Sequence, residues 1–259
     1  MSPSGILELP LDAYRLSAAD RQSLVRAQYV LADSCMRRRG MKWPAPLAPP
    51  GPGREPNQRR YGISDAALAA AYGYQLPPPV GVSRAEEYRW NQRNEGRLAS
   101  VDRATMNAYT GEGDSPGCQD RARQTLHMQW MNTSDPVSAA SSAAWARTKG
   151  DPRLRDLDRE WSACMRTSGH PQPDPLSAAG AWAGSGTTPG VRGPVGAPSA
   201  QEVSMARADV TCKTDVGYVE RRRTLEAGYQ ATEITARSRQ LEEYRSAWRL
   251  SLSTARSVR

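Results

Sequence analysis

The sequence predicts an all-α protein whose helices are linked by disulfides and separated by long Pro- and Gly-rich loops. Three observations predict it: apolar residues recur at spacings of three and four, no apolar/polar alternation extends over five residues between turn signals, and a Cys-Met motif recurs at expected helix ends. Only 38% of the 259 residues are hydrophobic and none is Phe, so the apolar mass is small for the length. A compact enzyme that fills the whole chain is therefore not expected.

The first helix is expected at residues 18–39. Ser17 opens it as an N-cap with an acidic residue three positions later, and Gly40 offers a left-handed stop. One face carries apolar residues: Val25, Tyr29, Ala32 and Met36. Eight of the thirteen residues at 44–56 are Gly or Pro, which predicts an extended connection after this helix.

A series of shorter helices should follow. They are expected near residues 66–72, 83–94, 100–109, 117–131, 136–148 and 152–168. The last two open on Asp135 and Asp151, each followed by proline at the first helical position, where a missing N–H donor costs nothing. We expect one N-terminal helical half at 1–148 and one C-terminal half at 149–259.

The C-terminal half should contain a loop and one long helix. Residues 170–198 are mostly Gly, Pro, Ala, Ser and Thr, which predicts a flexible loop. No proline follows Ser199, so a helix is expected over 199–255, with a break near Gly217 or Gly228. Its last turns carry an apolar stripe that we expect to be a partner surface or coiled contact: Leu241, Tyr244, Trp248 and Leu252.

The chain contains an internal repeat of cysteine, methionine, three residues and glycine. It occurs at residues 35–40 and again at 164–169, each time at the end of an expected helix. One further cysteine follows each copy, Cys118 after the first and Cys212 after the second, so the simplest pairing is Cys35 with Cys118 and Cys164 with Cys212. Four cysteines allow three connectivities, and both reduced cysteines and a zinc site remain alternatives.

Disulfides are favoured because they would offset the chain entropy lost by a loop-rich helical protein with little apolar mass. Structural disulfides need an oxidising compartment, so we expect an extracytoplasmic location. The first 30 residues lack a basic segment followed by an apolar one, so no signal peptide is expected in this chain, and no apolar run is long enough for a membrane span.

The net charge of +8 comes almost entirely from arginine. Only Lys42, Lys149 and Lys213 are lysines among the 35 basic residues. Arginines cluster locally, and the triplet Arg221, Arg222 and Arg223 is the expected contact for an anionic wall polymer or membrane surface. Solvated helix faces are the alternative interpretation of such clusters.

Motifs for chemistry are scarce. A Ser-His-Asp or Cys-His arrangement would have to use His127 or His170, which we interpret as a partly buried helical side chain and a helix-end cation. The segment 111–114 is Gly-rich and acidic but lacks calcium-loop spacing, which favours a turn. No catalytic residue, metal ligand or cofactor site is therefore predicted, and no small-molecule substrate is identified.

Several segments together resemble predicted secreted or lipoprotein-type proteins of actinobacteria. They are the two Cys-Met-x-x-x-Gly helix ends and the segments 59–63, 71–74, 117–118 and 208–213. The resemblance implies no established activity, and some such proteins accompany exporter or peptidoglycan-binding components. The chain departs from the pattern in lacking a lipobox or signal.

The sequence thus predicts a non-enzymatic, extracytoplasmic interaction or accessory protein of the cell envelope with a protein partner. The alternative is a cytosolic, Arg-rich helical protein that binds nucleic acid. Basic residues are interleaved with acidic ones rather than gathered on one face, which counts against that alternative.

Overall fold

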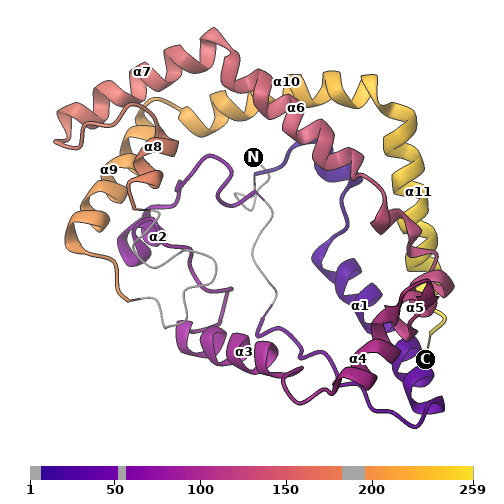
Figure 1. Ribbon diagram of the computed structural model, residues 1–259. Coiled ribbons are helices and arrows are strands. Elements are labelled where there is room, and N and C mark those ends of the chain that lie inside the picture. Colours follow the sequence, from indigo (N-terminus) through magenta and orange to yellow (C-terminus); the bar gives the residue numbers. More distant parts are fainter. Residues whose placement is uncertain (1–6, 52–56, 183–195, 259) are drawn as a thin grey trace. The chain divides into compact units, whose positions relative to one another are not determined.

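The computed structural model describes residues 7–51, 57–182 and 196–258, and over these ranges the protein is all-α apart from one short hairpin (Figure 1). The α-helices are α1 Ala18–Arg38, α2 Ala66–Tyr72, α3 Arg84–Gly96, α4 Arg103–Thr110, α5 Cys118–Thr125, α6 Pro136–Gly150, α7 Pro152–Thr167, α8 Pro175–Gly180, α9 Ala200–Asp215, α10 Tyr218–Ala236 and α11 Ser238–Ala255. Two 3₁₀ helices occupy Pro10–Tyr14 and Met128–Asn132. The predicted fold class is confirmed.

The expected capping residues begin their helices. Ser17 Oγ accepts the Asp20 amide at 3.0 Å and starts α1, and Asp65 accepts the Leu68 amide at 2.8 Å and starts α2. Asp151 accepts the Arg153 amide at 2.8 Å before the proline that opens α7. Helix α4 begins three residues later than expected, because Asp102 rather than Ser100 caps it.

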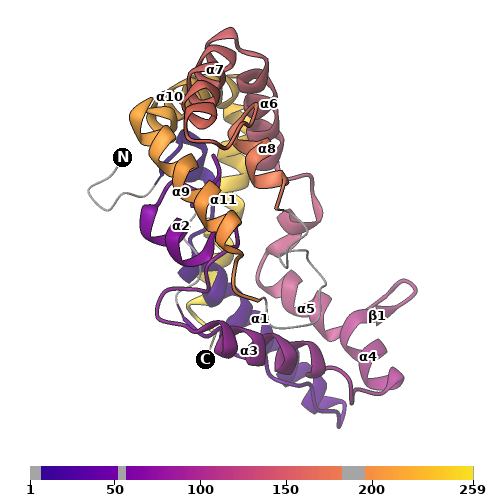
Figure 2. The same cartoon turned by 90° about the vertical axis from the view of Figure 1, so that its left-hand side faces the viewer.

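The region 111–132 is less helical than expected. Strands β1 Gly111–Glu112 and β2 Ser115–Pro116 pair antiparallel, so the predicted turn at 111–114 is the tip of a hairpin directly after α4 (Figure 2). A continuous helix over 117–131 is wrong. Helix α5 ends at Thr125, and His127 adopts the left-handed conformation with φ 54°, which separates α5 from the 3₁₀ helix Met128–Asn132.

Two expectations about the C-terminal region also need correction. The segment 170–198 is not wholly a loop: Asp174 caps α8, and Ala178 is buried, while residues 183–195 lie outside the described part. The helix expected over 199–255 is α9, α10 and α11, so the break predicted near Gly217 is confirmed and a second break was not predicted. Gly217, with φ 62°, separates the first two, Arg237 separates the last two, and Gly228 lies within α10 without interrupting it.

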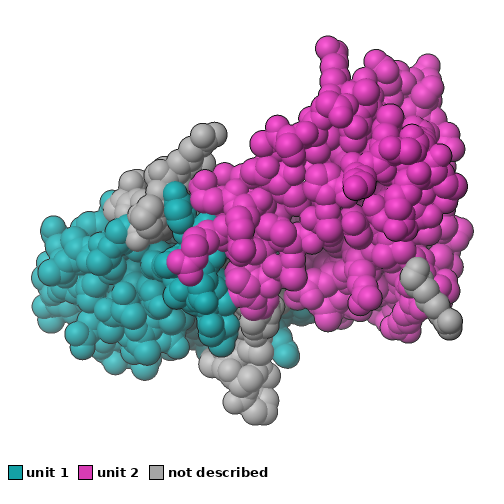
Figure 3. Space-filling model, turned by 90° about the horizontal axis from the view of Figure 1, so that it is seen from below, with its two compact units in different colours: residues 1–12, 53–88, 141–233 teal, residues 13–52, 89–140, 234–259 magenta. Residues whose placement is uncertain are grey.

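The chain forms two compact units (Figure 3). Unit 1 comprises residues 1–12, 53–88 and 141–233, and unit 2 comprises 13–52, 89–140 and 234–259. Each unit therefore combines segments from both of the sequence halves, 1–148 and 149–259, that were expected as domains.

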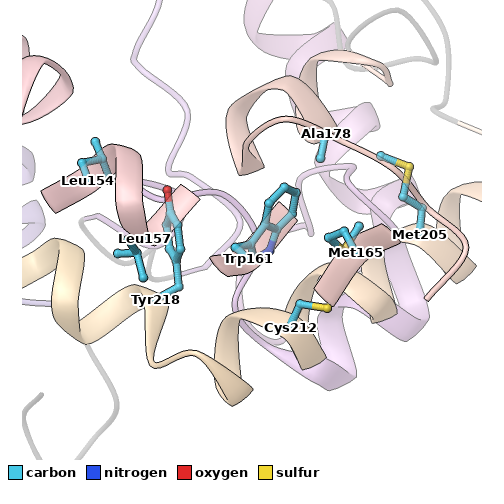
Figure 4. Close-up of a cluster of buried hydrophobic side chains, with 8 residues drawn as sticks. All are labelled: Leu154, Leu157, Trp161, Met165, Ala178, Met205, Cys212 and Tyr218. Carbon is cyan, nitrogen blue, oxygen red and sulfur yellow. The ribbon is translucent and has the colours of Figure 1, made fainter. Parts of the chain in front are cut away.

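The core of unit 1 is built from α7, α8, α9 and the start of α10. Trp161, fully buried on α7, lies within a cluster whose other members are Leu154, Leu157, Met165, Ala178, Met205, Cys212 and Tyr218 (Figure 4). A smaller cluster joins α2 to α9 through Ile63, Ala69, Ala206 and Val210. These clusters explain how Ala178 in a Gly- and Pro-rich segment becomes ordered: it packs on the large side chains of α7 and α9.

The core of unit 2 has two clusters along α1. One consists of Leu24, Ala27, Leu126, Met128, Trp248, Leu252 and Ala255, and the other of Ala32, Cys35, Met36, Trp43, Ala108, Cys118 and Ala122. The Trp43 and Tyr109 rings stack with their centroids 3.6 Å apart beside the second cluster. Helix α1 thus packs on both α5 and α11.

Candidate functional site: disulfide-linked units and an aromatic pocket

Each unit contains one disulfide, and the predicted pairing is confirmed. Cys35 is bonded to Cys118 in unit 2, with Cα atoms 5.6 Å apart, and Cys164 to Cys212 in unit 1, with Cα atoms 5.7 Å apart. Both are within the normal range for disulfides. All four cysteines are thereby used, which excludes them as zinc ligands, and no cluster of three metal-ligating side chains occurs in the described ranges.

The repeated motif forms the same local structure twice. After α1 the Met41 amide donates to the Met36 carbonyl at 3.0 Å, and after α7 the His170 amide donates to the Met165 carbonyl at 2.9 Å. Gly40 and Gly169 precede these donors with φ 72° and 78°, as a Schellman helix end requires. Each helix end therefore presents a buried methionine next to a disulfide-bonded cysteine.

The expected partner stripe on α11 is part of the core instead. Leu241 is fully buried, and Trp248 and Leu252 are buried against Leu24 and Ala27 of α1. Tyr244 is half-buried and packs edge-to-face on Trp130, with ring centroids 5.5 Å apart. The three- and four-residue spacing correctly predicted an apolar face on α11. This face packs on α1 of the same chain and not on a partner protein.

The arginine triplet does not form one exposed, unpaired basic surface. Arg221 donates to Glu160 at 2.5 Å and 2.9 Å, and Arg223 donates to Glu220 at 2.8 Å and 2.5 Å. Arg222 is 2% exposed, so it cannot contact a polymer. The Glu220–Arg223 pair has ordinary i,i+3 helical spacing, but spacing could not identify Glu160, which comes from α7, nor the interior position of Arg222.

Unit 1 encloses an ion pair between Asp209 and Lys213, one turn apart on α9. Lys213 Nζ donates to Asp209 Oδ2 at 3.1 Å and to the Ile63 carbonyl at 2.7 Å, while Trp161 and Tyr74 also donate to the carboxylate. Burial raises the pKa of Asp209 against the opposing effect of Lys213, and burial lowers the pKa of Lys213. Every carboxylate oxygen has a donor, which is what a buried charge requires.

A second buried polar group surrounds Glu226 of α10. Glu226 accepts hydrogen bonds from Arg60, from Tyr61 Oη at 3.0 Å and from Gln230 Nε2 at 2.8 Å. Arg222 lies over the Trp145 ring, 4.6 Å from its centroid. Burial, then the nearby Glu226 charge, raises the pKa of the Tyr61 hydroxyl. Glu226 is enclosed with its donors, so this group orders the interior of unit 1, while Arg222 Nε is buried without a hydrogen-bond partner among the described residues.

The two histidines lie outside both polar groups. His127 is exposed in its left-handed turn, contrary to the expectation of a partly buried helical side chain. His170 lies just beyond the end of α7, as expected, and its Nε2 is 3.1 Å from Ser204 Oγ. Ser204 was not considered from the sequence. A nucleophile–base pair needs a third group that orients the base, and no described carboxylate is hydrogen-bonded to His170.

Unit 2 contains a half-open pocket of about 330 Å³ that the sequence did not predict. Its aromatic walls come from Tyr14, Trp130 and Tyr244, and its rim includes the apolar residues Val25 and Met131. The latter two are 52% and 48% exposed. The size and the mainly apolar lining are typical of small binding sites.

Hydrogen bonds hold the aromatic wall of this pocket in place. Trp130 Nε1 donates to Ser251 Oγ at 2.9 Å, and Ser251 Oγ donates to the His127 carbonyl at 2.9 Å. Ser251 is fully buried on α11. The left-handed turn at His127 therefore serves the pocket, because it directs a carbonyl toward Ser251. The stripe residue Tyr244 was singled out from the sequence, but its role in a pocket wall depends on a 3₁₀ helix that periodicity could not predict.

A second cavity, of about 360 Å³, adjoins the hairpin of unit 2 and is more polar. Its lining includes Asp114, Asp120, Arg123 and Gln124. Asp120 and Arg123 are 4.0 Å apart, and Asp120 also accepts the Gly117 amide at 3.3 Å. Asp120 and Arg123 are thus engaged with the protein, in contrast to the exposed apolar rim of the aromatic pocket.

No protein-family model, curated protein or solved structure matches the chain. Among the described helices, none combines the length and the apolar character needed to cross a bilayer.

Proposed function

We propose that the protein is a non-enzymatic binding protein of the cell envelope that works in an oxidising, extracytoplasmic compartment. The observation that carries this proposal is the presence of one disulfide in each unit, both at equivalent helix ends. Structural disulfides persist outside the cytoplasm and are rare within it. The aromatic pocket of unit 2 supplies a surface for the binding role. An association with an exporter or peptidoglycan-binding system follows only from the resemblance to actinobacterial secreted proteins.

The test is the state of the cysteines in protein purified from its native host. The protein is alkylated under denaturing conditions without reductant, and its peptides are mapped by mass spectrometry. We expect no alkylated cysteine and two cross-linked peptides, Cys35 with Cys118 and Cys164 with Cys212. Four alkylated cysteines would contradict the extracytoplasmic proposal and would favour the cytosolic alternative.

That alternative, nucleic-acid binding, makes a separate prediction about salt. Affinity for a DNA duplex would fall steeply between low and moderate salt because neutralised phosphates release counterions. We expect no such binding, since Arg221 and Arg223 are already paired with acidic side chains.

A further inference from the structure

The aromatic pocket of unit 2 has three features together: its lining is mainly apolar, hydrogen bonds fix its aromatic wall, and its rim is exposed to solvent. Leu24, Met128 and Val137 are buried beneath it, while Val25 and Met131 expose about half of their surface at its rim. Exposed apolar side chains that gather around one apolar pocket favour an interaction site, whereas singly exposed apolar residues do not. Methionine also adapts its shape to different occupants.

Two of the three charged residues that line the pocket are arginines. Arg15 and Arg21 line it, and Asp135 is its one acidic lining residue. The Asp135 carboxylate is already used to start α6, since it accepts from the Val137 amide at 2.9 Å and from Ser138 Oγ at 2.6 Å. Arg21 donates one hydrogen bond to the Leu16 carbonyl and makes no ion pair with a described carboxylate. An occupant would therefore gain from carrying carboxylates beside its apolar part.

From this combination we infer that the pocket binds an acidic peptide segment of a partner protein and receives one large apolar side chain from it. The inference rests on the proposed binding role and adds the chemistry of the partner. A cavity of about 330 Å³ is at the small end of ligand sites, which suits a single side chain. The apolar rim then contacts the flanking peptide, and Arg21 pairs with an acidic residue next to the inserted side chain.

A peptide fits these features better than a nucleic acid does. Single-stranded nucleic acid requires a positively charged groove that follows many phosphates, together with aromatic faces for successive bases. Here one compact pocket has an aliphatic rim of Val25 and Met131 and only two lining arginines. The hydrogen bond from Trp130 to Ser251 fixes the pocket wall before binding, which reduces the ordering cost for a peptide side chain.

The test uses the oxidised full-length chain labelled with ¹³C at the methionine methyl groups. The probe is the acetylated, amidated peptide Asp-Glu-Trp-Glu-Asp, titrated to millimolar concentration and followed by NMR. We expect saturable shifts at Met128 and Met131, which line the pocket, and none at Met36 or Met165, which are buried at the two helix ends. The same peptide with alanine for tryptophan, or with lysine for each acid, should bind at least about tenfold more weakly.

Two variants locate the binding. Val25→Glu places a negative charge on the rim and should weaken binding of the acidic peptide about tenfold or more. Leu250→Glu is the matched control, because Leu250 is 51% exposed on α11 but does not line the pocket, and its affinity should stay unchanged. Arg21→Gln should reduce the affinity for the acidic peptide and the salt dependence of binding, with little effect on a neutral peptide.

Several outcomes would overturn the inference: no shifts at Met128 and Met131, equal binding of the lysine peptide, equal weakening by Leu250→Glu, or stronger binding of oligothymidine than of the peptide. Failure of peptide binding together with intact native disulfides would remove the inference and leave the extracytoplasmic proposal standing. Reduced cysteines in the native protein would remove that proposal whatever the pocket binds.

Discussion

The two units share a cross-link and differ in what they enclose. Each has a Cys-Met-x-x-x-Gly helix end with the glycine in the left-handed conformation and a disulfide to a second helix. Unit 1 encloses charged residues, among them Asp209, Lys213, Arg222 and Glu226, whereas the buried residues described in unit 2 are apolar with the exception of Ser251. Unit 2 instead has an open aromatic pocket.

This difference indicates that the same disulfide-linked helix end can support either a charged interior, as in unit 1, or an apolar interior, as in unit 2. Buried ion pairs offer little net stability compared with well-packed apolar groups, but they demand complete hydrogen bonding and thus favour one arrangement. An apolar interior with an exposed rim tolerates an incoming side chain. Unit 1 thus has the more specific buried polar arrangement, and unit 2 contains the pocket to which we assign the proposed binding role.

The largest effect should come from removing a disulfide. The loops closed by the bonds have sequence separations of 83 and 48 residues, for which the chain-entropy model gives about 4 kcal/mol of stabilisation each. Cys35→Ser with Cys118→Ser should cost about 0.5 kcal/mol more than Cys164→Ser with Cys212→Ser because its loop is longer. Urea unfolding of the two double variants measures this, and equal stability of either variant and wild type would contradict it.

Removing one member of the buried ion pair should be nearly as damaging. Asp209→Ala leaves Lys213 buried without its carboxylate and Trp161 and Tyr74 without their acceptor, which should cost about 3 to 5 kcal/mol. The double variant Asp209→Leu with Lys213→Met should recover the part of that loss that comes from the unpaired Lys213 charge, while Trp161 and Tyr74 remain without an acceptor. If the double variant were as unstable as the single one, the ion pair would not explain the interior of unit 1.

In unit 2 the corresponding polar residue is Ser251. Ser251→Ala removes the acceptor of Trp130 and should cost about 1 to 3 kcal/mol, as expected for a buried unsatisfied donor. The pocket wall should also lose order, so peptide affinity should fall while the unit 1 core keeps its protection from hydrogen exchange. Ser253→Ala on the exposed side of α11 is the control and should leave both measurements unchanged.

The smallest expected effect is on the pH dependence of folding stability. Hydrogen bonds from Arg153, aided by Tyr229, lower the pKa of Asp151 below its usual range in spite of its burial. A carboxyl whose pKa is lower in the folded state stabilises the fold above its unfolded pKa of about 3.9, and the stabilisation is lost as the pH falls. Asp151→Asn keeps an N-cap acceptor but lacks the ionised carboxylate that pairs with Arg153, so it should be slightly less stable than wild type at neutral pH, and its stability should fall less steeply than that of wild type below about pH 4. Unfolding stability is measured against pH for both proteins. If the two stabilities fell equally steeply below about pH 4, the pKa of Asp151 would not be lowered in the folded state.

Local signals explain how much of the fold could be predicted from the sequence. Caps at Ser17, Asp65 and Asp151 and the glycines after the repeated motif act within a few residues, so α1, α2 and α7 were placed correctly. The cysteine pairing followed from the repeat. The left-handed turn at His127 could not be predicted, because a residue other than glycine adopts it only when long-range contacts, here with Ser251, stabilise it.

The site was less accessible to prediction than the fold. Tyr244, Trp248 and Arg222 were correctly recognised as members of periodic or charged patterns, but the same patterns suit either a buried or an exposed face. Their environment is decided by segments far away in the sequence, such as Tyr14, whose carbonyl accepts from Trp248 Nε1 at 3.3 Å, and Trp145, which underlies Arg222. The pocket exists only because α1, the 3₁₀ helix Met128–Asn132 and α11 meet within unit 2.

Each unit is held by its own disulfide, and hydrogen exchange of the double variant Cys35→Ser with Cys118→Ser shows whether this is so. We expect loss of protection in α1, α5 and α11 of unit 2, while α7 and α9 of unit 1 exchange as in wild type. Equal loss of protection in α7 and α9 would contradict the claim, because the two disulfides would then stabilise one cooperative structure.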